Sequence, residues 1–249
     1  MKASDIMEQY VVVTGAGHKN GIGYAIAEEL FVQGYIPILA DISFDDGLPF
    51  GYYTLDVADE NEVSLFWDNM DDKNIVALAN VAGITIIGKL VDYNLSDYEK
   101  TLNVNLIGPF LMSKYFVAAY PSSDIERYVI NIGSDASNRP IHRSFAYCSS
   151  KAALSMLTRC LALDFAQDNF RFIQIDQGWV EGTGMDKSVI QQVWDLDQMP
   201  ADELRMHMLS HAPMERPLDP KEIAVWIPFL IQNGSYATGS CIRIVGGLK

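Results

Sequence analysis

Residues 10–34 read YVVVTGAGHKNGIGYAIAEELFVQG, in which a short apolar run, a glycine-rich segment and a helix-length stretch follow one another. The apolar run predicts a buried strand. The last stretch predicts a helix that ends at Gly34 and buries one face, formed by Ile22, Ile26, Leu30 and Phe31. A glycine turn between a strand and a helix lets backbone N–H groups approach a phosphate at the helix N-terminus. The stretch therefore predicts the first unit of a nucleotide-binding α/β fold.

The same alternation of strand and helix continues along the chain. Further apolar runs predict strands at 35–41, 52–57, 74–83, 127–134, 171–178 and 241–247. Helix-length segments fall at 60–70, 97–119, 146–166 and 220–232. Such alternation produces right-handed crossovers and a parallel sheet with helices on both faces. We therefore predict a single α/β domain over residues 1–249, with a Rossmann-type, doubly wound parallel sheet of about seven strands. The segment between Asp41 and Asp56 has no room for a helix and predicts an ordered loop.

The composition excludes several classes of partner. With 249 residues, 49% hydrophobic content and a formal net charge of −14, the chain is a poor match for nucleic acid or an anionic membrane surface. The N-terminus carries no signal-peptide pattern, and polar residues interrupt the most apolar region, 75–91. Three cysteines without metal-ligand spacing fit a reducing compartment, so we expect a cytoplasmic protein. His207 and His211 are four apart but have no evident third ligand, so we expect no metal.

One carboxylate stands where a dinucleotide is usually recognised. Asp41 ends the second predicted strand, 26 residues beyond Gly15. A carboxylate at this place holds the adenosine ribose hydroxyls of NAD and repels the 2′-phosphate of NADP. The alternatives are that Asp41 only caps a loop, or that Lys19 favours NADP. We expect NAD as the cofactor.

Polar residues near the predicted carboxyl edge of the sheet form a second pattern. Tyr147 and Lys151 are four apart in YCSSK and share one face of a predicted helix. Ser134 ends the fifth strand, 13 residues before Tyr147, and Asn105 lies in the long helix before that strand. Open α/β sheets bind ligands at the carboxyl edge, so these residues are candidates for a catalytic group.

Together these motifs resemble those of the short-chain dehydrogenase/reductase family. The matching segments are TGAGHKNGIG, LDVAD, NVAG, NVNLIGPF, NIGS, YCSSK, QGWVEGTGM and YATGSCIRIVGG. The resemblance implies a sheet in the order 3-2-1-4-5-6-7, a nicotinamide cofactor and a catalytic tetrad at Asn105, Ser134, Tyr147 and Lys151. It also implies a homotetramer or dimer in which the last two long helices make contact.

The resemblance further implies which residues hold the cofactor. These are Gly15, Asn20, Gly21, Ile22, Asp41, Asp56, Val57, Asn80, Ala82, Gly83, Tyr147, Lys151, Gly178 and Val180. The sequence departs from the family pattern in its glycine turn, which has five residues, 16–20, between Gly15 and Gly21, more than the family usually has. It departs again where Val81, Gln177 and Val245 replace the usual Asn, Pro and Asp.

The implied tetrad fits the chemistry of alcohol oxidation and ketone reduction. A tyrosine with a pKa of about 10 is a poor base at neutral pH, and we expect the Lys151 ammonium and the nicotinamide to lower the pKa of Tyr147. Tyr147 then takes the alcohol proton in oxidation or supplies it in reduction. Ser134 hydrogen-bonds the substrate oxygen and Lys151 also binds the nicotinamide ribose. Asn105 holds a water that links Lys151 to solvent.

Arg139, His142 and Arg143 lie in the loop between the fifth strand and the following helix, which is expected to border the substrate pocket. They are either surface charges or subunit contacts, or they clamp an anionic substrate. The segments DISFDDGLPFGYYTLDVAD and GSDASNRPI are similar to the 2,3-dihydro-2,3-dihydroxybenzoate dehydrogenases, which oxidise a cyclic dihydrodiol acid. Trp179 flanks residues 180–215, which either form a mobile substrate lid or only pack against the fold.

We therefore predict an NAD-dependent oxidoreductase that transfers a hydride between nicotinamide and a small secondary alcohol or ketone. The resemblance to the dihydrodiol dehydrogenases implies that this substrate is cyclic, a dihydrodiol or a hydroxy acid. The alternative is a non-catalytic NAD-binding regulatory protein on the same fold, but such a protein need not retain both Tyr147 and Lys151. An epimerase or dehydratase of the extended type needs a larger substrate domain than this chain provides.

Overall fold

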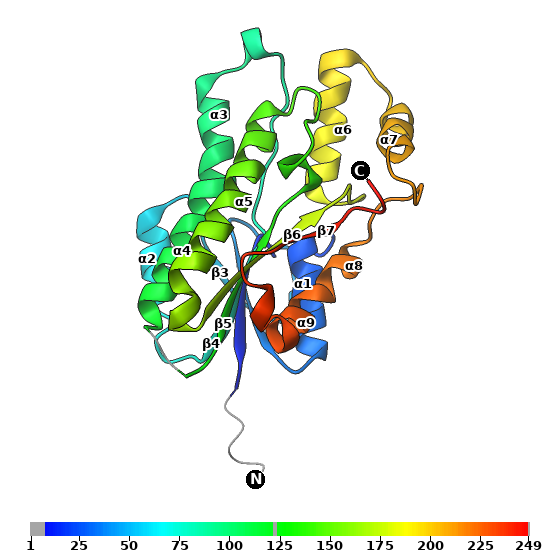
Figure 1. Cartoon of the computed structure of the whole chain (residues 1–249). Coiled ribbons are helices and arrows are strands. Elements are labelled where there is room, and N and C mark those ends of the chain that lie inside the picture. The colour runs from blue at the N-terminus through cyan, green and yellow to red at the C-terminus, as the bar shows by residue number, and fades with distance from the viewer. Residues whose placement is uncertain (1–7, 122–123, 249) are drawn as a thin grey trace.

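Seven strands form one sheet in the computed structural model, which describes residues 8–121 and 124–248 (Figure 1). The strands are β1 (Tyr10–Thr14), β2 (Ile36–Asp41), β3 (Gly51–Thr54), β4 (Ile75–Asn80), β5 (Arg127–Ile132), β6 (Phe170–Gln177) and β7 (Cys241–Ile244). Their order is β3-β2-β1-β4-β5-β6-β7, which confirms the predicted order. Every neighbouring pair is parallel, so the carboxyl ends of all the strands meet at one edge of the sheet.

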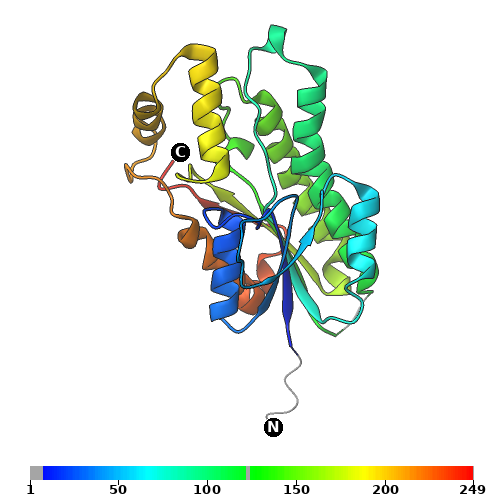
Figure 2. The same cartoon turned by 180° about the vertical axis from the view of Figure 1, so that it is seen from behind.

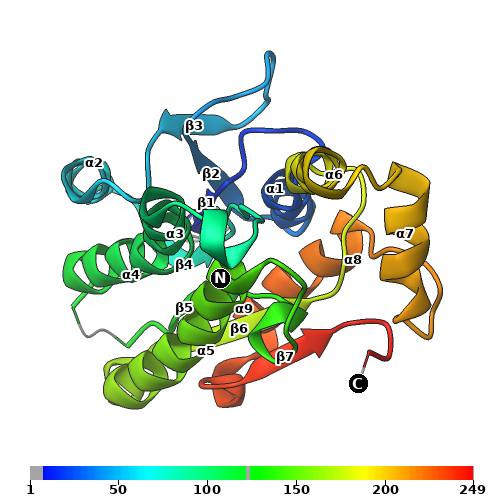
Figure 3. The same cartoon turned by 90° about the horizontal axis from the view of Figure 1, so that it is seen from above.

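Helices cover both faces of this sheet, as predicted (Figures 2 and 3). Their bounds are α1 (Ile22–Val32), α2 (Glu60–Asp68), α3 (Leu95–Leu102), α4 (Gly108–Ala119), α5 (Phe145–Phe165), α6 (Gly184–Asp197), α7 (Ala201–Ser210), α8 (Pro220–Ala224) and α9 (Trp226–Asn233). On one face α1 packs with α8 and α9, and on the other α2 packs with α4 and α3 with α5. None of the described helices is long and apolar enough to span a membrane.

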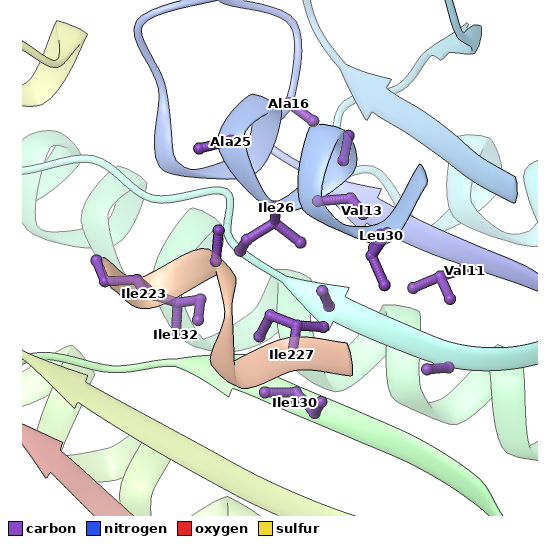
Figure 4. Packing of buried hydrophobic residues seen from close by; sticks show 14 of the residues in the cluster. Val11, Val13, Ala16, Ala25, Ile26, Leu30, Ile130, Ile132, Ile223 and Ile227 are labelled. Carbon is purple, nitrogen blue, oxygen red and sulfur yellow. The ribbon is translucent and has the colours of Figure 1, made fainter. Parts of the chain in front are cut away.

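The two faces of the sheet bury separate apolar clusters, because successive residues of a strand point to opposite faces. Val11 and Val13 belong to the cluster under α1, whereas Val12 belongs to the cluster under α2 and α4. Figure 4 shows the first cluster, whose labelled side chains are Val11, Val13, Ala16, Ala25, Ile26, Leu30, Ile130, Ile132, Ile223 and Ile227. This packing fixes the strand ends on which the candidate site is built.

Two of the predicted helices are interrupted. The helix predicted at 97–119 consists of α3 and α4, joined by a π-helical turn at Asn103–Ile107. The helix predicted at 220–232 consists of α8 and α9 in succession. Pro228 lacks the N–H that would bond to the carbonyl of Ala224, and α8 ends at Ala224 for this reason.

The segment after β2 is an ordered loop, as predicted, and the glycine turn explains its shape. Residues 42–50 contain no helix. The backbone N–H of Asp45 donates to the Gly17 oxygen at 2.8 Å. The Asp45 carboxylate accepts from the Lys19 N–H at 2.8 Å and contacts His18 Nδ1 at 3.1 Å. The lengthened glycine turn and the loop after β2 therefore hold each other in place.

The segment 180–215 forms α6, α7 and the turns around them. Asp186 fastens the start of α6, because its carboxylate accepts from Trp179 Nε1 and from the Gly182 N–H, each at 2.9 Å. The Thr183 hydroxyl in turn accepts from the Asp186 N–H at 3.2 Å. The base of this segment is thus held to the end of β6 by a buried carboxylate.

Candidate active site

The glycine turn lies at the carboxyl edge, between β1 and α1. Gly15 has a φ of +64°, and a Cβ there would lie 2.7 Å from backbone atoms of Ala82, so only glycine fits. The Thr14 hydroxyl accepts from the N–H groups of Val81 and Ala82 at 3.0 and 3.2 Å. The turn is therefore packed directly on the loop after β4 and leads into the N-terminus of α1 at Ile22. This arrangement fits the pyrophosphate of a dinucleotide.

Asp41 lies at the end of β2, as predicted, and its carboxylate faces the glycine turn. Oδ2 accepts from the Gly17 N–H at 2.9 Å and Oδ1 from the Ile42 N–H at 2.7 Å. Each oxygen keeps a further lone pair for a ribose hydroxyl. Lys19, which could favour NADP, instead donates from Nζ to the backbone oxygen of Asp46 at 2.9 Å.

Two further cofactor candidates follow β3, and one ends β4. Asp56 is exposed, whereas Val57 is buried and lies close to Gly108. Asn80 donates from Nδ2 to Asn131 Oδ1 at 2.9 Å across β4 and β5. The Asn80 Oδ1 is buried and has no hydrogen-bond partner among the described residues, so it is an acceptor that the rest of the chain leaves unused.

The remaining cofactor candidates follow β6 and β1 at the carboxyl edge. Gly178 follows β6, and its N–H donates to the Ile244 oxygen at 2.9 Å. Val180 is buried two residues later. After β1, Asn20 is exposed in the glycine turn, and the Gly21 N–H donates to the His18 oxygen at 2.8 Å. The sheet thus places them all along one edge.

Three of the four predicted catalytic residues meet where α5 lies beside β5 and β6 (Figure 3). Tyr147 and Lys151 share one face of α5, with Lys151 Nζ 5.7 Å from the centre of the Tyr147 ring. Ser134 follows β5, and its hydroxyl acts to lower the pKa of the neighbouring Tyr147. Lys151 Nζ donates to the Ile132 oxygen at 2.9 Å. All three side chains belong to residues less than a tenth exposed.

Asn105, the fourth residue, reaches the site from the π-helical turn between α3 and α4. Such turns add a residue to a helix and are frequent at functional sites. Asn105 Oδ1 accepts from the Ile84 N–H at 2.8 Å, and Nδ2 donates to the Ile84 oxygen at 2.9 Å and to Ser150 Oγ at 3.0 Å. A Cβ on Gly83 would lie 3.4 Å from Asn105 Oδ1 and 3.6 Å from Lys151 Nζ. The bare Gly83 therefore lies between the amide and the ammonium.

Burial sets the protonation of Tyr147 and Lys151. Desolvation lowers the pKa of Lys151 to about 8, although the negative charge of Asp176 acts to raise it. Desolvation raises the pKa of Tyr147 to about 12, against the lowering effect of the Ser134 hydrogen bond. The expected lowering of the pKa of Tyr147 is therefore not found in the chain itself, because the loss of water outweighs the favourable contact.

Arg139 and Arg143, which were candidates for an anion clamp, are both engaged by carboxylates of the chain. Arg139 Nε donates to Asp135 Oδ2 at 2.9 Å. Arg143 forms a close ion pair with Asp197, at the end of α6. To bind a substrate anion, either guanidinium would have to share or give up its carboxylate partner. His142, the third candidate in this loop, is exposed. Both arginines are therefore engaged in ion pairs within the chain, and the anion clamp stays one of the two hypotheses for this loop.

Four polar residues of the site have no role in the sequence-based prediction: Thr14, Ser150, Asp176 and Gln192. Thr14 and Ser150 lie inside the motifs TGAG and YCSSK, and that place is itself a signal. Gln192 of α6 accepts from the Ile87 N–H at 2.8 Å and donates to the Thr85 oxygen at 3.1 Å. These partners are about a hundred residues away in sequence, and no local pattern marks them.

Known proteins are similar to this chain in sequence and in fold. A family model described as enoyl-(acyl carrier protein) reductase matches residues 15–249. The chain belongs to the short-chain dehydrogenase/reductase family. It is 27% identical to L-xylulose reductase of Caenorhabditis elegans, over 98% of this chain and 97% of that protein. It is 26% identical to 2,5-dichloro-2,5-cyclohexadiene-1,4-diol dehydrogenase of Sphingobium indicum, over 98% of each chain.

The ligand-free structure of Thermoplasma acidophilum aldohexose dehydrogenase superimposes with a TM-score of 0.88 at 28% identity, covering 98% of this chain and 95% of that one. Like other short-chain dehydrogenases/reductases, the protein is an oxidoreductase that uses a nicotinamide cofactor and acts on a small alcohol or ketone. Among residues 8–121 and 124–248, no group of three or more His, Cys, Asp or Glu side chains is placed to hold a metal ion. His207 and His211 pack edge to face with ring centres 5.0 Å apart.

Replacing Lys151 by Met should stabilise this short-chain dehydrogenase/reductase at neutral pH. The folded-state pKa of Lys151, about 8, lies below its ordinary value of 10.5. The buried ammonium therefore costs free energy below pH 8, and the cost disappears as the pH rises through both values. At about 1.4 kcal/mol per pKa unit, this cost is roughly 3 kcal/mol.

Urea unfolding of wild type and Lys151→Met at pH 7 and at pH 11 measures the effect. Lys187→Met, an exposed position on α6, is the matched control and should leave the free energy of unfolding unchanged. A Lys151→Met protein no more stable than wild type at pH 7 would contradict the lowered pKa.

Proposed function

We propose that the protein is an NAD-dependent dehydrogenase that interconverts a secondary alcohol and a ketone. The observation that carries the proposal is the meeting of Ser134, Tyr147 and Lys151 at the carboxyl edge, with the Ser134 hydroxyl acting to lower the pKa of Tyr147 and the ammonium 5.7 Å from the Tyr147 ring. A hydrogen-bond donor, a proton carrier and a cation are thereby gathered in a site with little water.

Each residue of the tetrad has a defined role in this proposal. The nicotinamide cofactor supplies the hydride chemistry when bound. Ser134 and Tyr147 hydrogen-bond the substrate oxygen, and Tyr147 takes its proton in oxidation or returns it in reduction. Lys151 holds the nicotinamide ribose and places positive charge beside Tyr147. Asn105, whose amide is fixed by Ile84, holds the water that links Lys151 to solvent.

The preference for NAD is supported by the charge at the adenosine end of the glycine turn. Asp41 and Asp45 each accept a backbone N–H of this turn, from Gly17 and Lys19. Both carboxylates therefore lie beside the place of the adenosine ribose, where a 2′-phosphate would meet negative charge. Lys19 Nζ is engaged by the Asp46 backbone and does not offset this charge at Asp41.

For the substrate we propose a small molecule with hydroxyl groups next to the reacting carbon, cyclic diols included. The names of the two relatives given above, a ketose reductase and a cyclic diol dehydrogenase, support this class. In this proposal residues 180–215 form the lid over the site. Met185 of α6 supports this role, because a Cβ on Gly83, beside Asn105 and Lys151, would lie 3.8 Å from the Met185 Cε. The whole chain then acts as one dinucleotide-binding and catalytic domain in the cytoplasm, where its free cysteines stay reduced.

A homo-oligomer is supported by the exposed apolar residues of the long helices. Met156 and Leu163 of α5 are 57% and 83% exposed and lie seven residues apart, on one face of the helix. Ile107 and Phe110, at the start of α4, are 39% and 40% exposed. A dimer or tetramer that joins these helices would bury this apolar surface.

Replacing Tyr147 by Phe should lower kcat by about 10²- to 10⁴-fold, because the proton carrier is lost while the ring remains. NADH affinity should change little. The assay follows NADH absorbance with a panel of secondary alcohols, polyols, cyclic diols and their ketones in both directions, with an enoyl thioester included. Tyr24→Phe, which removes another buried tyrosine hydroxyl, is the control.

A Tyr147→Phe protein that kept a tenth of the wild-type kcat would refute the assignment. If wild type bound NADH but turned over nothing in the panel, the non-catalytic regulatory protein would become the better interpretation. Reduction of the thioester alone would move the protein to a different reaction class.

Replacing Asp41 by Ala should lower the ratio of kcat/KM for NAD to that for NADP by about tenfold or more, since the like-charge repulsion of the 2′-phosphate is removed. Asp68→Ala makes the same charge change at an exposed position on α2 and should leave the ratio unchanged. Equal ratios in wild type and Asp41→Ala would show that another residue sets the preference.

Sedimentation velocity tests the assembly. Wild type should sediment as a species larger than the 27.7 kDa chain, and Leu163→Glu should shift it towards the monomer because a charge enters the apolar contact. Val32→Glu, at a 74% exposed position on α1, should keep the wild-type size. Monomeric wild-type protein would rule out the oligomer.

A further inference from the structure

A buried carboxylate lies behind the tetrad and takes no part in the mechanism above. Asp176, the next-to-last residue of β6, is fully buried. Its Oδ1 accepts from Gln174 Nε2 at 2.6 Å, and its Oδ2 accepts from Asn138 Nδ2 at 3.1 Å. The Ser137 hydroxyl lies 3.4 Å from Oδ1. A carboxylate without water is costly unless such partners hold it, so a charged group at this place needs a reason.

The surroundings of Asp176 join it to the catalytic residues. A Cβ on Gly133 would lie 2.2 Å from Asp176 Oδ1, so the carboxylate rests against the backbone directly before Ser134. The residue on the other side of Gly133 is Ile132, whose oxygen accepts from Lys151 Nζ at 2.9 Å. The ammonium and the carboxylate therefore contact the same short stretch of backbone.

Ser137 adds a second connection, from the turn after β5 to α5. Its hydroxyl lies 3.1 Å from the backbone oxygen of Lys151 as well as 3.4 Å from Asp176 Oδ1, so one proton is shared between the two acceptors. Asn138 in the same turn donates to Oδ2. Asp176 thus fastens the turn that carries Ser134 to the sheet beside Lys151.

Apart from Asp176, the groups described around Lys151 are neutral or are paired with cations. Asp176 is therefore the source of negative charge at Lys151. On its own helix Lys151 faces Tyr147, the π-helical turn presents the neutral amide of Asn105, and β5 presents a carbonyl. Asp135, the buried carboxylate next to Ser134, is paired with two cations, Arg139 and Arg243.

The charge of Asp176 acts to raise the pKa of Lys151, and Cys148 and Asp176 add to the rise that desolvation causes in the pKa of Tyr147. In β6 and β7, Arg243 is the register partner of Asp176, but its guanidinium bonds to Asp135.

We propose that Asp176 is a positioning residue whose buried carboxylate is the counter-charge of the Lys151 ammonium, while its hydrogen bonds fix the turn that carries Ser134. The proposal rests on the proposed function only in naming Lys151 and Tyr147 as the reacting pair. With the carboxylate present, Lys151 stays protonated to higher pH than its burial alone allows. The ammonium remains available to hold a ribose.

The sign of the effect follows from the charge. Asp176 raises the pKa of Lys151, which burial has lowered to about 8. Asp176→Asn removes the negative charge and keeps the shape, so Lys151 should lose its proton at lower pH than in wild type, by about one pH unit or more. Asn138→Ala removes one hydrogen bond to Asp176 but leaves its charge, and should keep the wild-type midpoint.

The titration is read without turnover, from the 13Cε chemical shift of Lys151 in cofactor-free protein labelled on lysine. The signal is assigned by its loss in Lys151→Met. A lower midpoint in Asp176→Asn with a wild-type midpoint in Asn138→Ala supports the counter-charge. An unchanged midpoint in Asp176→Asn, or equal shifts in both variants, overturns it, since a purely structural role moves no midpoint selectively.

Should Asp176→Asn fail to fold, the double variant Asp176→Asn, Asn138→Asp keeps an amide–carboxylate pair and moves the charge to an exposed residue. Its midpoint should also fall below that of wild type, and a wild-type midpoint there overturns the proposal. The proposed function is tested separately by Tyr147→Phe. If the Lys151 midpoint shifts in Asp176→Asn but Tyr147→Phe stays active, the proposed function is refuted and the counter-charge is retained. If the midpoint does not shift but Tyr147→Phe is inactive, the counter-charge is refuted and the proposed function is retained.

Discussion

The buried ammonium of Lys151 is the constraint on which the rest of the site depends. The amino group loses its water where α5 packs on the sheet, and this loss lowers its pKa to about 8. The Ile132 oxygen and the charge of Asp176 offset part of the cost. Tyr147 shares the same dry surroundings, so its pKa rises. Burial therefore favours the uncharged form of both groups.

The glycine turn and the loop after β2 depend on each other. The glycine turn has five residues, 16–20, between Gly15 and Gly21, and the loop after β2 takes the place of a crossover helix. Asp45 joins them through the backbone of Gly17 and Lys19 and the ring of His18. The longer turn thus supplies the contacts that order a loop without a helix. Because the partner that joins them is a carboxylate, the same contact adds negative charge beside Asp41.

The loops above the tetrad are held together by polar contacts from α6. Gln192 binds both Ile87 and Thr85 in the loop after β4, and Arg143 pairs with Asp197 at the other end of the helix. Arg143 has a φ of +57°, a strained conformation for a residue with a side chain, and its oxygen also accepts from the Gly88 N–H at 3.1 Å. An arginine held in this way joins three segments of the edge, which explains why it is engaged within the chain.

The sequence by itself determined the order of strands and helices, the glycine turn, and the tetrad candidates, because each depends on local patterns of apolar residues, glycines and fixed spacings. The helix break before Pro228 and the π-helical turn that carries Asn105 depend on backbone hydrogen bonds that these patterns do not resolve. Only the tertiary structure decided the protonation of Tyr147 and Lys151, the partners of Arg139 and Arg143, and the place of Asp176. The physical reason is that desolvation and charge pairing depend on which distant segments exclude water from a group, and a linear sequence does not specify those neighbours.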